Sequence, residues 1–253
     1  MDLQLKGRKA IITGGSKGIG RAIADLLAEE GCHVAICARN AGEVEAAVAA
    51  LRGKGVDAFG QAIDVRDKAA LEGWVKASAD ALGGIDIAVA NVSALDMNRT
   101  EEAWINQFEI DMLHTVRTVE AALPHIERSD AGSILVISSV SGLEYDFTSP
   151  AYGTFKAALI HYASRMASTL APKHIRVNTV SPGNTYFEGG IWQHIERNMP
   201  DLFKTALAKN PWGRMATDAE VANAAVFLVS PRASFITGVD LVVDGALTNR
   251  VQY

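Results

Sequence analysis

The chain has 253 residues, 49% of them hydrophobic, and a formal net charge of −5, so no basic face for nucleic acid is expected. No apolar run is long enough to cross a bilayer, and the polar amino terminus lacks the apolar stretch of a secretory signal. These features favour a cytoplasmic protein without nucleic-acid or membrane partners. Cys32 and Cys37 lack thiol-rich spacing and the histidines lack ligand spacing, so we predict buried thiols and no metal site.

Short apolar runs alternate with helical patterns along the chain. We predict strands at 8–13, 33–38, 56–63, 85–91, 133–138, 174–180 and 239–243. We predict helices at 19–30, 41–52, 66–81, 101–128, 150–170 and 217–229. Strands that alternate with helices imply parallel crossover connections and a sheet covered on both faces. The predicted fold is therefore a single α/β domain over 1–253, a doubly wound parallel sheet of the Rossmann type.

Residues 184–213 interrupt this alternation. We interpret them as a small helical insertion that forms a lid over the substrate, with a hinge at Glu188-Gly189-Gly190. Its large side chains, with two before the 150–170 helix, predict apolar pocket walls: Tyr145, Phe147, Tyr186, Phe187, Ile191, Trp192, Met199, Phe203 and Trp212. Simple packing or a subunit contact explains the same composition equally well.

A glycine-rich turn, Thr13-Gly14-Gly15-Ser16-Lys17-Gly18-Ile19-Gly20, joins the first strand to the first helix. Glycines let the backbone approach a pyrophosphate, and the free N–H groups of the helix amino terminus attract the anion. The position after the first strand favours a dinucleotide site over a tight packing turn. The predicted cofactor contacts here are Gly14, Ser16, Lys17, Gly18, Ile19 and Gly20.

The choice of cofactor is predicted from the end of the second strand. A site that prefers NAD carries an acid there for the ribose 2′-hydroxyl, but this chain has Ala38 and Arg39. A guanidinium without a neighbouring acid suits a 2′-phosphate, which Lys17 also reaches, so we predict NADP(H). Two ordinary surface cations are the alternative. Asp64, after the third strand, is predicted to face the adenine, to cap the helix that begins near Arg66, or both.

Tyr152 and Lys156 lie four residues apart, on one face of a helix whose start is predicted at Ser149 and Pro150. Ser139 ends the preceding strand, at the sheet edge where open α/β folds bind ligands. A phenol has a pKa of ~10, and one ammonium ~4 Å away at an effective dielectric near 20 supplies about 4 kcal/mol, enough to lower that pKa by about 2–3 units. The group therefore predicts proton transfer to a carbonyl oxygen held by Ser139, although Tyr-x-x-x-Lys alone is common by chance.

In order and spacing, these motifs resemble the short-chain dehydrogenase/reductase family, in the single-domain branch of 3-oxoacyl-carrier-protein reductases and hydroxysteroid dehydrogenases. The resemblance spans roughly Leu5 to Thr248. It rests on Thr13-Gly14, Gly18-Ile19-Gly20, Asp64-Val65, Asn91, Ser138-Ser139-Val140-Ser141-Gly142, Tyr152, Lys156, Val177-Asn178, Pro182-Gly183 and Val243-Asp244-Gly245. By that resemblance, Ser139, Tyr152 and Lys156 are catalytic.

The resemblance also implies further contacts and an assembly. It adds Val65 and Asn91 to the cofactor contacts, together with Tyr152 and Lys156. The stretch from Asn178 to Gly183, which includes Pro182, would lie by the nicotinamide, with Thr185 near its amide. The family is usually dimeric or tetrameric through the helices at 101–128 and 150–170, which implies a homodimer or homotetramer.

Two positions depart from the family pattern. Ala90-Asn91-Val92-Ser93 stands where the family has Asn-Asn-Ala-Gly, which places bulkier side chains against the adenosine side. Asp111 corresponds to the family's fourth catalytic residue, an asparagine that helps hold a water linked to the lysine. An ionised aspartate only accepts hydrogen bonds; it keeps Lys156 charged but opposes an ionised Tyr152. We expect the protein to turn over with a raised apparent pKa in its pH–rate profile. The alternative is that Asp111 only satisfies the helix backbone.

The sequence thus predicts an NADP(H)-dependent oxidoreductase that moves a hydride between the nicotinamide and a carbonyl or secondary alcohol of a largely apolar small molecule. Two other interpretations stay open. An NAD-dependent hydroxy-compound dehydrogenase is disfavoured by Arg39 and the absent acid. A non-catalytic, cofactor-binding regulatory protein is suggested by the departures at Ala90, Val92, Ser93 and Asp111, but it does not explain the presence of Ser139, Tyr152 and Lys156 together.

Overall fold

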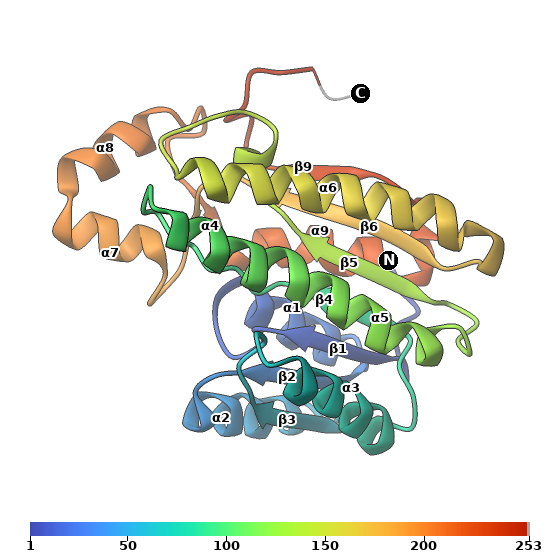
Figure 1. Cartoon of the computed structure of the whole chain (residues 1–253). Helices are drawn as coiled ribbons and strands as arrows, with labels where there is room; N and C mark the ends of the chain where they lie inside the picture. Colours follow the sequence, from blue (N-terminus) through green and yellow to red (C-terminus); the bar gives the residue numbers. More distant parts are fainter. Residues whose placement is uncertain (252–253) are drawn as a thin grey trace.

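The computed structural model describes residues 1–251 (Figure 1). The strands of its main sheet are β1 (Lys9–Thr13), β2 (His33–Ala38), β3 (Ala58–Ala62), β4 (Ile87–Ala90), β5 (Ser133–Ile137), β6 (Arg176–Pro182) and β9 (Asp240–Val243). Within the described residues, these seven strands are parallel in the order β3-β2-β1-β4-β5-β6-β9. The order reverses between β1 and β4, and the crevice of such a fold lies beyond the carboxyl ends of those two strands.

Helices cover both faces of this sheet, which confirms the predicted doubly wound fold. One face carries α1 (Gly18–Glu29), α2 (Ala41–Arg52) and α9 (Asp218–Val229). The opposite face carries α3 (Lys68–Leu82), α5 (His114–Ile126) and α6 (Pro150–Leu170). No helix within residues 1–251 is both long and apolar enough to cross a membrane.

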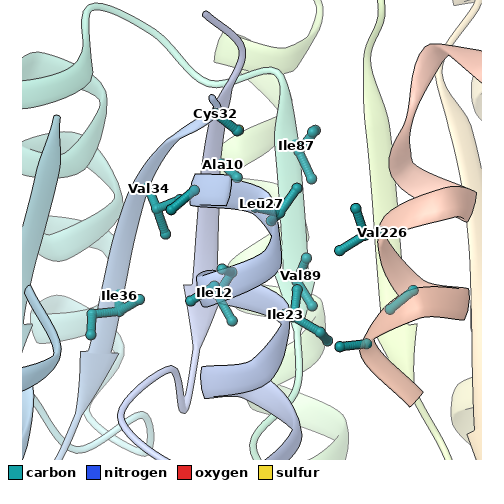
Figure 2. Close-up of a cluster of buried hydrophobic side chains, with 14 of the residues drawn as sticks. Ala10, Ile12, Ile23, Leu27, Cys32, Val34, Ile36, Ile87, Val89 and Val226 are labelled. Atoms are coloured by element: carbon teal, nitrogen blue, oxygen red, sulfur yellow. The ribbon is translucent and has the colours of Figure 1, made fainter. Parts of the chain in front are cut away.

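Strand side chains alternate between two hydrophobic cores. In β1, Ala10 and Ile12 enter one core while Ile11 enters the other. Figure 2 shows the first core, where strand residues Ala10, Ile12, Val34, Ile36, Ile87 and Val89 meet Ile23, Leu27 and Val226 from the helices. Burial on both faces explains why these strands are nearly continuous apolar runs. Cys32 and Cys37 are both fully buried as predicted, and burial raises the pKa of each thiol.

The predicted helix at 101–128 is interrupted by a wider turn. It begins as α4 (Glu101–Gln107), passes through a π-helical segment at Phe108–Leu113 and continues as α5. A π turn spaces its backbone hydrogen bonds more widely than an α-helix, and such turns are frequent at functional sites. Here the Thr115 hydroxyl donates to the Asp111 carbonyl at 2.7 Å, so a side chain supports the backbone of the widened segment.

His114 connects the π-helical segment to the glycine-rich turn. Its Nδ1 lies 2.8 Å from the Ile110 carbonyl oxygen, and its Nε2 lies 2.8 Å from Thr13 Oγ1. A carbonyl only accepts, so Nδ1 carries the proton and Nε2 accepts from the Thr13 hydroxyl. Thr13 Oγ1 in turn accepts from the backbone N–H of Asn91. Burial lowers the pKa of His114 to about 4, which keeps the imidazole neutral.

The segment at 184–213 forms a small helical insertion, as predicted. It contains β7 (Thr185–Tyr186), α7 (Ile191–Asn198) and α8 (Pro200–Ala208), and β7 pairs with β8 (Ala216–Thr217). The two helices stand at one end of the molecule, away from the main sheet (Figure 1). They enclose a small core of their own, which contains Trp192, Ile195, Ala206 and Met215.

Arg176, in β6, is a buried cation without an acidic partner among residues 1–251. Its guanidinium donates to three carbonyl oxygens at the end of α9, those of Leu228, Val229 and Ser230, and to that of Ile236 in the segment before β9. Only 8% of the residue is exposed, and burial lowers its pKa to about 10, so it stays charged near neutrality. These bonds satisfy carbonyls that the end of a helix leaves unpaired.

We predict that Arg176→Gln lowers the free energy of unfolding by about 3 kcal/mol, because buried carbonyls lose their donors. Arg165 is an exposed arginine on α6 and provides the control. Arg165→Gln should change the same free energy by less than about 0.5 kcal/mol. Urea denaturation of both variants at one protein concentration measures the difference; equal losses would contradict this role for Arg176.

We also predict a stability loss at mildly acidic pH that depends on His114. The folded-state pKa of about 4 lies below the ordinary value of 6.5, so the unfolded chain binds a proton first as the pH falls. From pH 7 to pH 5, this linkage lowers the free energy of unfolding by about 2 kcal/mol. His114→Gln should remove that contribution from the pH dependence, whatever its effect at pH 7. An unchanged slope between pH 5 and pH 7 would show that the histidine is not held neutral.

Candidate active site

A cleft of about 580 Å³ opens beyond the carboxyl ends of the central strands. The glycine-rich turn lines one part of it, the ends of β5 and β6 line another, and the 184–213 insertion borders it. Its size is within the usual range for small-molecule sites. Ser139, Tyr152 and Lys156, predicted from the sequence to lie together, all line this cleft.

The glycine-rich turn is packed too tightly for side chains at several positions. A Cβ at Gly20 would lie 2.3 Å from the Gly14 carbonyl oxygen, and Gly14 and Gly18 adopt φ of +68° and +57°. The N–H groups of Gly14 and Gly15 both donate to the Cys37 carbonyl, which fixes the turn to β2. Lys17, the N-cap of α1, makes no side-chain cap, so the first helical N–H groups stay available. The residues present therefore fit a pyrophosphate.

Asn91 holds the glycine-rich turn in place. Its Nδ2 donates to the carbonyl oxygens of Thr13 at 3.0 Å and Gly14 at 3.3 Å, although the residue also borders the cleft. Val92, one of the unusual bulky residues, lies over the same turn, with Cγ2 3.0 Å from where a Gly14 Cβ would be. The departure from the family pattern is thus accommodated by packing against Gly14.

The end of the cleft that Lys17 and Arg39 line also contains an acid, Glu43, that was not among the predicted site residues. Glu43, in the first turn of α2, accepts a hydrogen bond from Ser16 Oγ at 3.2 Å and lines the cleft with Lys17 and Arg39. The available signal was Asn40, whose side chain caps Glu43 N and so predicts the start of α2. The acid that acts on Arg39 is Asp64: the positive charge of Arg39 contributes to lowering the pKa of that carboxyl, so the predicted absence of a neighbouring acid was wrong.

Asp64 lines the same end of the cleft but does not cap α3. Its carboxylate pairs with Arg66 at 2.6 Å, and this hydrogen bond is the main cause that lowers the pKa of Asp64. The side chain that caps α3 is Asp67, which accepts from Ala70 N. The predicted capping role was therefore wrong, whereas Val65 and Asp64 do border the cleft as expected.

At the other end of the cleft, Pro182, Gly183 and Thr185 line the wall as the resemblance implied. Thr185 Oγ1 donates to the Gly183 carbonyl at 3.1 Å. Asn178 does not lie with them. The residue is 1% exposed. Its side chain donates to the Ile236 carbonyl and accepts from the Val239 N–H, so it stabilises the segment that leads into β9.

Ser139 follows β5, and Tyr152 and Lys156 lie in the first two turns of α6. Pro150 begins α6 with Ser149 at the N-cap position, as predicted, but the Ser149 hydroxyl donates to Asn98 O instead of capping the helix. The Lys156 Nζ lies 5.6 Å from the centroid of the Tyr152 ring. The same Nζ donates to the Ile137 carbonyl at 3.1 Å, which anchors the lysine beside β5.

The pKa of Tyr152 is raised above its ordinary value, and burial is the main cause. The Lys156 ammonium and a hydrogen bond with Ser139 oppose this shift, while Asp111 and Asp146 add to it. In the free protein Tyr152 is therefore a neutral phenol near pH 7. This is the form that donates a proton to a carbonyl oxygen.

Asp111 lies in the π-helical segment and contacts Lys156 directly. Its Oδ1 is 3.1 Å from Lys156 Nζ, and its Oδ2 accepts from the backbone N–H of Ala94 at 2.9 Å. The Oδ1 contact is an ion pair without hydrogen-bond alignment. Both side chains are almost fully buried, with 0% of the Asp111 side chain and 2% of the Lys156 side chain exposed. One oxygen of the Asp111 carboxylate thus holds the backbone N–H of Ala94, and the other contacts the lysine.

Fewer residues form the apolar wall of the cleft than the sequence predicted. Four of the predicted side chains line it: Phe147, Phe187, Ile191 and Trp192. The ring centroids of Phe147 and Trp192 lie 5.6 Å apart, with the rings edge to face. The other predicted wall residues do not line it: Tyr186 and Phe203 pack against the core of the insertion, while Tyr145, Met199 and Trp212 are exposed. Composition does not show which aromatic side chains face inward.

Comparison with known proteins agrees with this geometry. The family described as Enoyl-(Acyl carrier protein) reductase matches residues 14–248. Isoepoxydon dehydrogenase from Aspergillus clavatus is 39% identical and covers 98% of both chains, and the 3-oxoacyl-[acyl-carrier-protein] reductase of Vibrio cholerae is 34% identical over 97% of this chain and 99% of its own. L-sorbose reductase from Gluconobacter frateurii, solved with NADPH and L-sorbose, matches with a TM-score of 0.91 and 29% identity over 99% of this chain and 100% of its own. The chain therefore belongs to the short-chain dehydrogenase/reductase family and is a nicotinamide-dependent oxidoreductase.

Proposed function

We propose that this protein is an NADP(H)-dependent reductase that transfers a hydride to the carbonyl of a largely apolar small molecule, or removes one from the corresponding secondary alcohol. The observation that carries the proposal is the convergence of Ser139, Tyr152 and Lys156 in the cleft that also contains the glycine-rich turn. Within the cleft, these three supply a hydroxyl, a phenol and an ammonium, which are the groups that proton transfer to a carbonyl oxygen requires.

When bound, the nicotinamide supplies or accepts the hydride. Tyr152 donates its phenolic proton to the carbonyl oxygen as negative charge develops there, and Ser139 Oγ holds that oxygen. Lys156 stabilises the phenolate that remains, since an ammonium beside it favours the charged form. In the oxidative direction, the phenolate of Tyr152 takes the proton of the alcohol. The buried, neutral phenol of the free protein suits the reductive direction.

The preference for NADP(H) rests on Lys17 and Arg39, both exposed at the adenosine end of the cleft. Their two positive charges attract a 2′-phosphate, whereas the carboxylate of Glu43 repels it or binds a 2′-hydroxyl. Solved relatives include one bound to NADPH and L-sorbose and a 7α-hydroxysteroid dehydrogenase bound to NADH. The other acid at this end, Asp64, is paired with Arg66, so Lys17 and Arg39 outweigh Glu43 and favour NADP(H). An NAD-dependent dehydrogenase is the second candidate because of Glu43.

The insertion at 184–213 is proposed as a lid over the substrate. It contributes Phe187, Ile191 and Trp192 to the cleft, and Gly189, at φ +73° with open space around it, allows the backbone to turn. An apolar wall of this kind favours a ring-bearing or aliphatic carbonyl. Two curated relatives are named for such chemistry, isoepoxydon dehydrogenase and a 2,5-dichloro-2,5-cyclohexadiene-1,4-diol dehydrogenase.

A homodimer or homotetramer is proposed through α4 and α6. Trp104 and Phe108 are 40% and 43% exposed, and both rings contact Phe155 of α6. Together they form an aromatic surface on the helices that the family resemblance implicates in assembly. Cytoplasmic location stays a prediction from the sequence.

The cofactor assignment predicts opposite effects for Arg39 and Glu43. Arg39→Ser should weaken NADPH binding about tenfold, because a charge-assisted bond to the phosphate is lost, and leave NADH binding nearly unchanged. Glu43→Gln should strengthen NADPH binding. Fluorescence titrations with both nucleotides at one ionic strength measure these effects. Tighter binding of NADH than of NADPH by the unaltered protein would favour the second candidate.

Asp111 predicts a shift in the pH–rate profile. Its negative charge raises the pKa of Tyr152, so Asp111→Asn should lower that pKa. Oxidation needs the phenolate, so its rise with pH should move to lower pH in the variant. Reduction needs the neutral phenol, so its fall with increasing pH should move the same way. Superimposable profiles would leave Asp111 with a structural role only.

The function itself is tested by nucleotide binding followed by turnover. Purified protein is saturated with NADPH and offered a panel of cyclic, aromatic and β-keto carbonyls, with NADPH absorbance as the readout. We expect at least one substrate, and a loss of about 10³-fold in kcat for Tyr152→Phe with NADPH binding retained. Tight NADPH binding without turnover on any panel member would favour a regulatory protein, and absence of binding would overturn the cofactor assignment.

A further inference from the structure

The carboxylate of Asp146 lines the cleft close to Ser139. Ser139 Oγ lies 3.2 Å from Ser141 Oγ, and Ser141 Oγ donates to Asp146 Oδ2 at 2.7 Å. The backbone N–H of Ser141 also donates to Ser139 Oγ, so the turn after β5 fixes this spacing. A single serine therefore separates the carboxylate from the hydroxyl that the proposed reaction places against the carbonyl oxygen of the substrate.

Both oxygens of this carboxylate are oriented by the protein and can still accept further hydrogen bonds. Oδ2 accepts from the Ser141 hydroxyl, and Oδ1 accepts from the backbone N–H of Thr148 at 2.8 Å. A carboxylate has about four lone-pair sites, so each oxygen keeps a free one. The residue is exposed. Asp146 is thus a fixed hydrogen-bond acceptor with unused capacity on the wall of the cleft.

Asp146 also carries a charge that no neighbouring cation neutralises. Asp111 pairs with Lys156, whereas no ion pair within residues 1–251 includes Asp146. Lys17 and Arg39, the other cations that line the cleft, lie in the glycine-rich turn and just after β2. An unpaired carboxylate attracts a hydrogen-bond donor and repels a second carboxylate.

Apolar side chains adjoin this acceptor. Phe147 follows Asp146 in the chain, and its ring packs edge to face against Trp192. Both rings line the cleft together with Ile191. An ammonium loses more hydration than a hydroxyl when it enters an apolar environment. The donor that suits an acceptor beside such a wall is therefore a neutral hydroxyl on a largely apolar carbon skeleton.

We propose that Asp146 selects hydroxy-ketones as substrates by accepting a hydrogen bond from the substrate hydroxyl; this inference rests on the proposed function. The carbonyl oxygen lies against Ser139 and the hydroxyl lies against Asp146. Two polar contacts on one wall of the cleft orient the substrate, while the aromatic wall contacts its carbon skeleton. Keto acids are disfavoured, because their carboxylate meets that of Asp146.

The test compares ketones that differ in one substituent. Cyclohexanone and acetophenone are each compared with hydroxy-, amino- and carboxylate-substituted derivatives, and the loss of NADPH absorbance gives kcat/KM. The unaltered protein should prefer a hydroxy-ketone to its parent by about tenfold, the value of one charge-assisted hydrogen bond. The keto acid should be the poorest substrate of each set.

Two variants of Asp146 should change these preferences in different ways. Asp146→Ala removes the acceptor, so the ratio of kcat/KM between hydroxy-ketone and parent should fall to about one. Asp146→Lys reverses the charge, so the keto acid should become a better substrate than the parent. A ratio between two substrates of one variant cancels effects common to both, such as a change in the ionisation of Tyr152.

Glu144→Gln is the matched control, because it removes a carboxylate from the same loop. Glu144 accepts from the backbone N–H of Asn249 and does not border the cleft, so we expect its ratios to match those of the unaltered protein. NADPH binding and melting temperature check that each variant is folded.

The outcomes separate the selectivity from the reaction. A hydroxy-ketone preference that is lost in Asp146→Ala and kept in Glu144→Gln supports the proposal. An unaltered protein without that preference, a ratio unchanged in Asp146→Ala, or a stronger preference for the amino-ketone overturns it. An unaltered protein that reduces no ketone overturns the proposed function as well, whereas an active protein whose ratios do not depend on Asp146 overturns the selectivity alone.

Discussion

The buried ion pair between Lys156 and Asp111 is the constraint on which the rest of the site depends. An isolated buried charge costs several kcal/mol, and each partner offsets part of the cost of burying the other. Their 3.1 Å contact therefore joins α6 to the π-helical segment, and the bond from Ala94 N extends this connection to the loop after β4. The lysine is held within 5.6 Å of the Tyr152 ring centroid as a result.

The cofactor end of the cleft is coupled to the same segment. His114, directly after the π turn, bonds both to Ile110 and to Thr13, and Thr13 accepts from the N–H of Asn91. Asn91 in turn donates to the carbonyls of the glycine-rich turn. The π-helical segment therefore connects the Lys156–Asp111 ion pair to the glycine-rich turn. Such preorganisation reduces the reorganisation that catalysis requires.

The layered fold, the glycine-rich turn and the Ser139, Tyr152 and Lys156 group could be predicted because each leaves a local pattern in the sequence. The π turn could not, since it is maintained by side-chain bonds from residues such as Thr115 and by the tertiary contact of His114 with Thr13. Glu43 escaped prediction because folding brings the start of α2 beside Ser16. Aromatic composition predicted a wall, but only the folded loops show that Tyr145 faces solvent.

The ionisation of Tyr152 in the free protein is the most direct measure of how this buried charge pair acts on the phenol. Carbon-13 labelling of the tyrosine Cζ, with Tyr152→Phe for assignment, lets NMR follow the phenol across alkaline pH. We expect its pKa to lie above the ordinary value of ~10 and to fall in Asp111→Asn. A Tyr152 pKa that is unchanged or higher in Asp111→Asn would contradict the electrostatic role assigned to the pair.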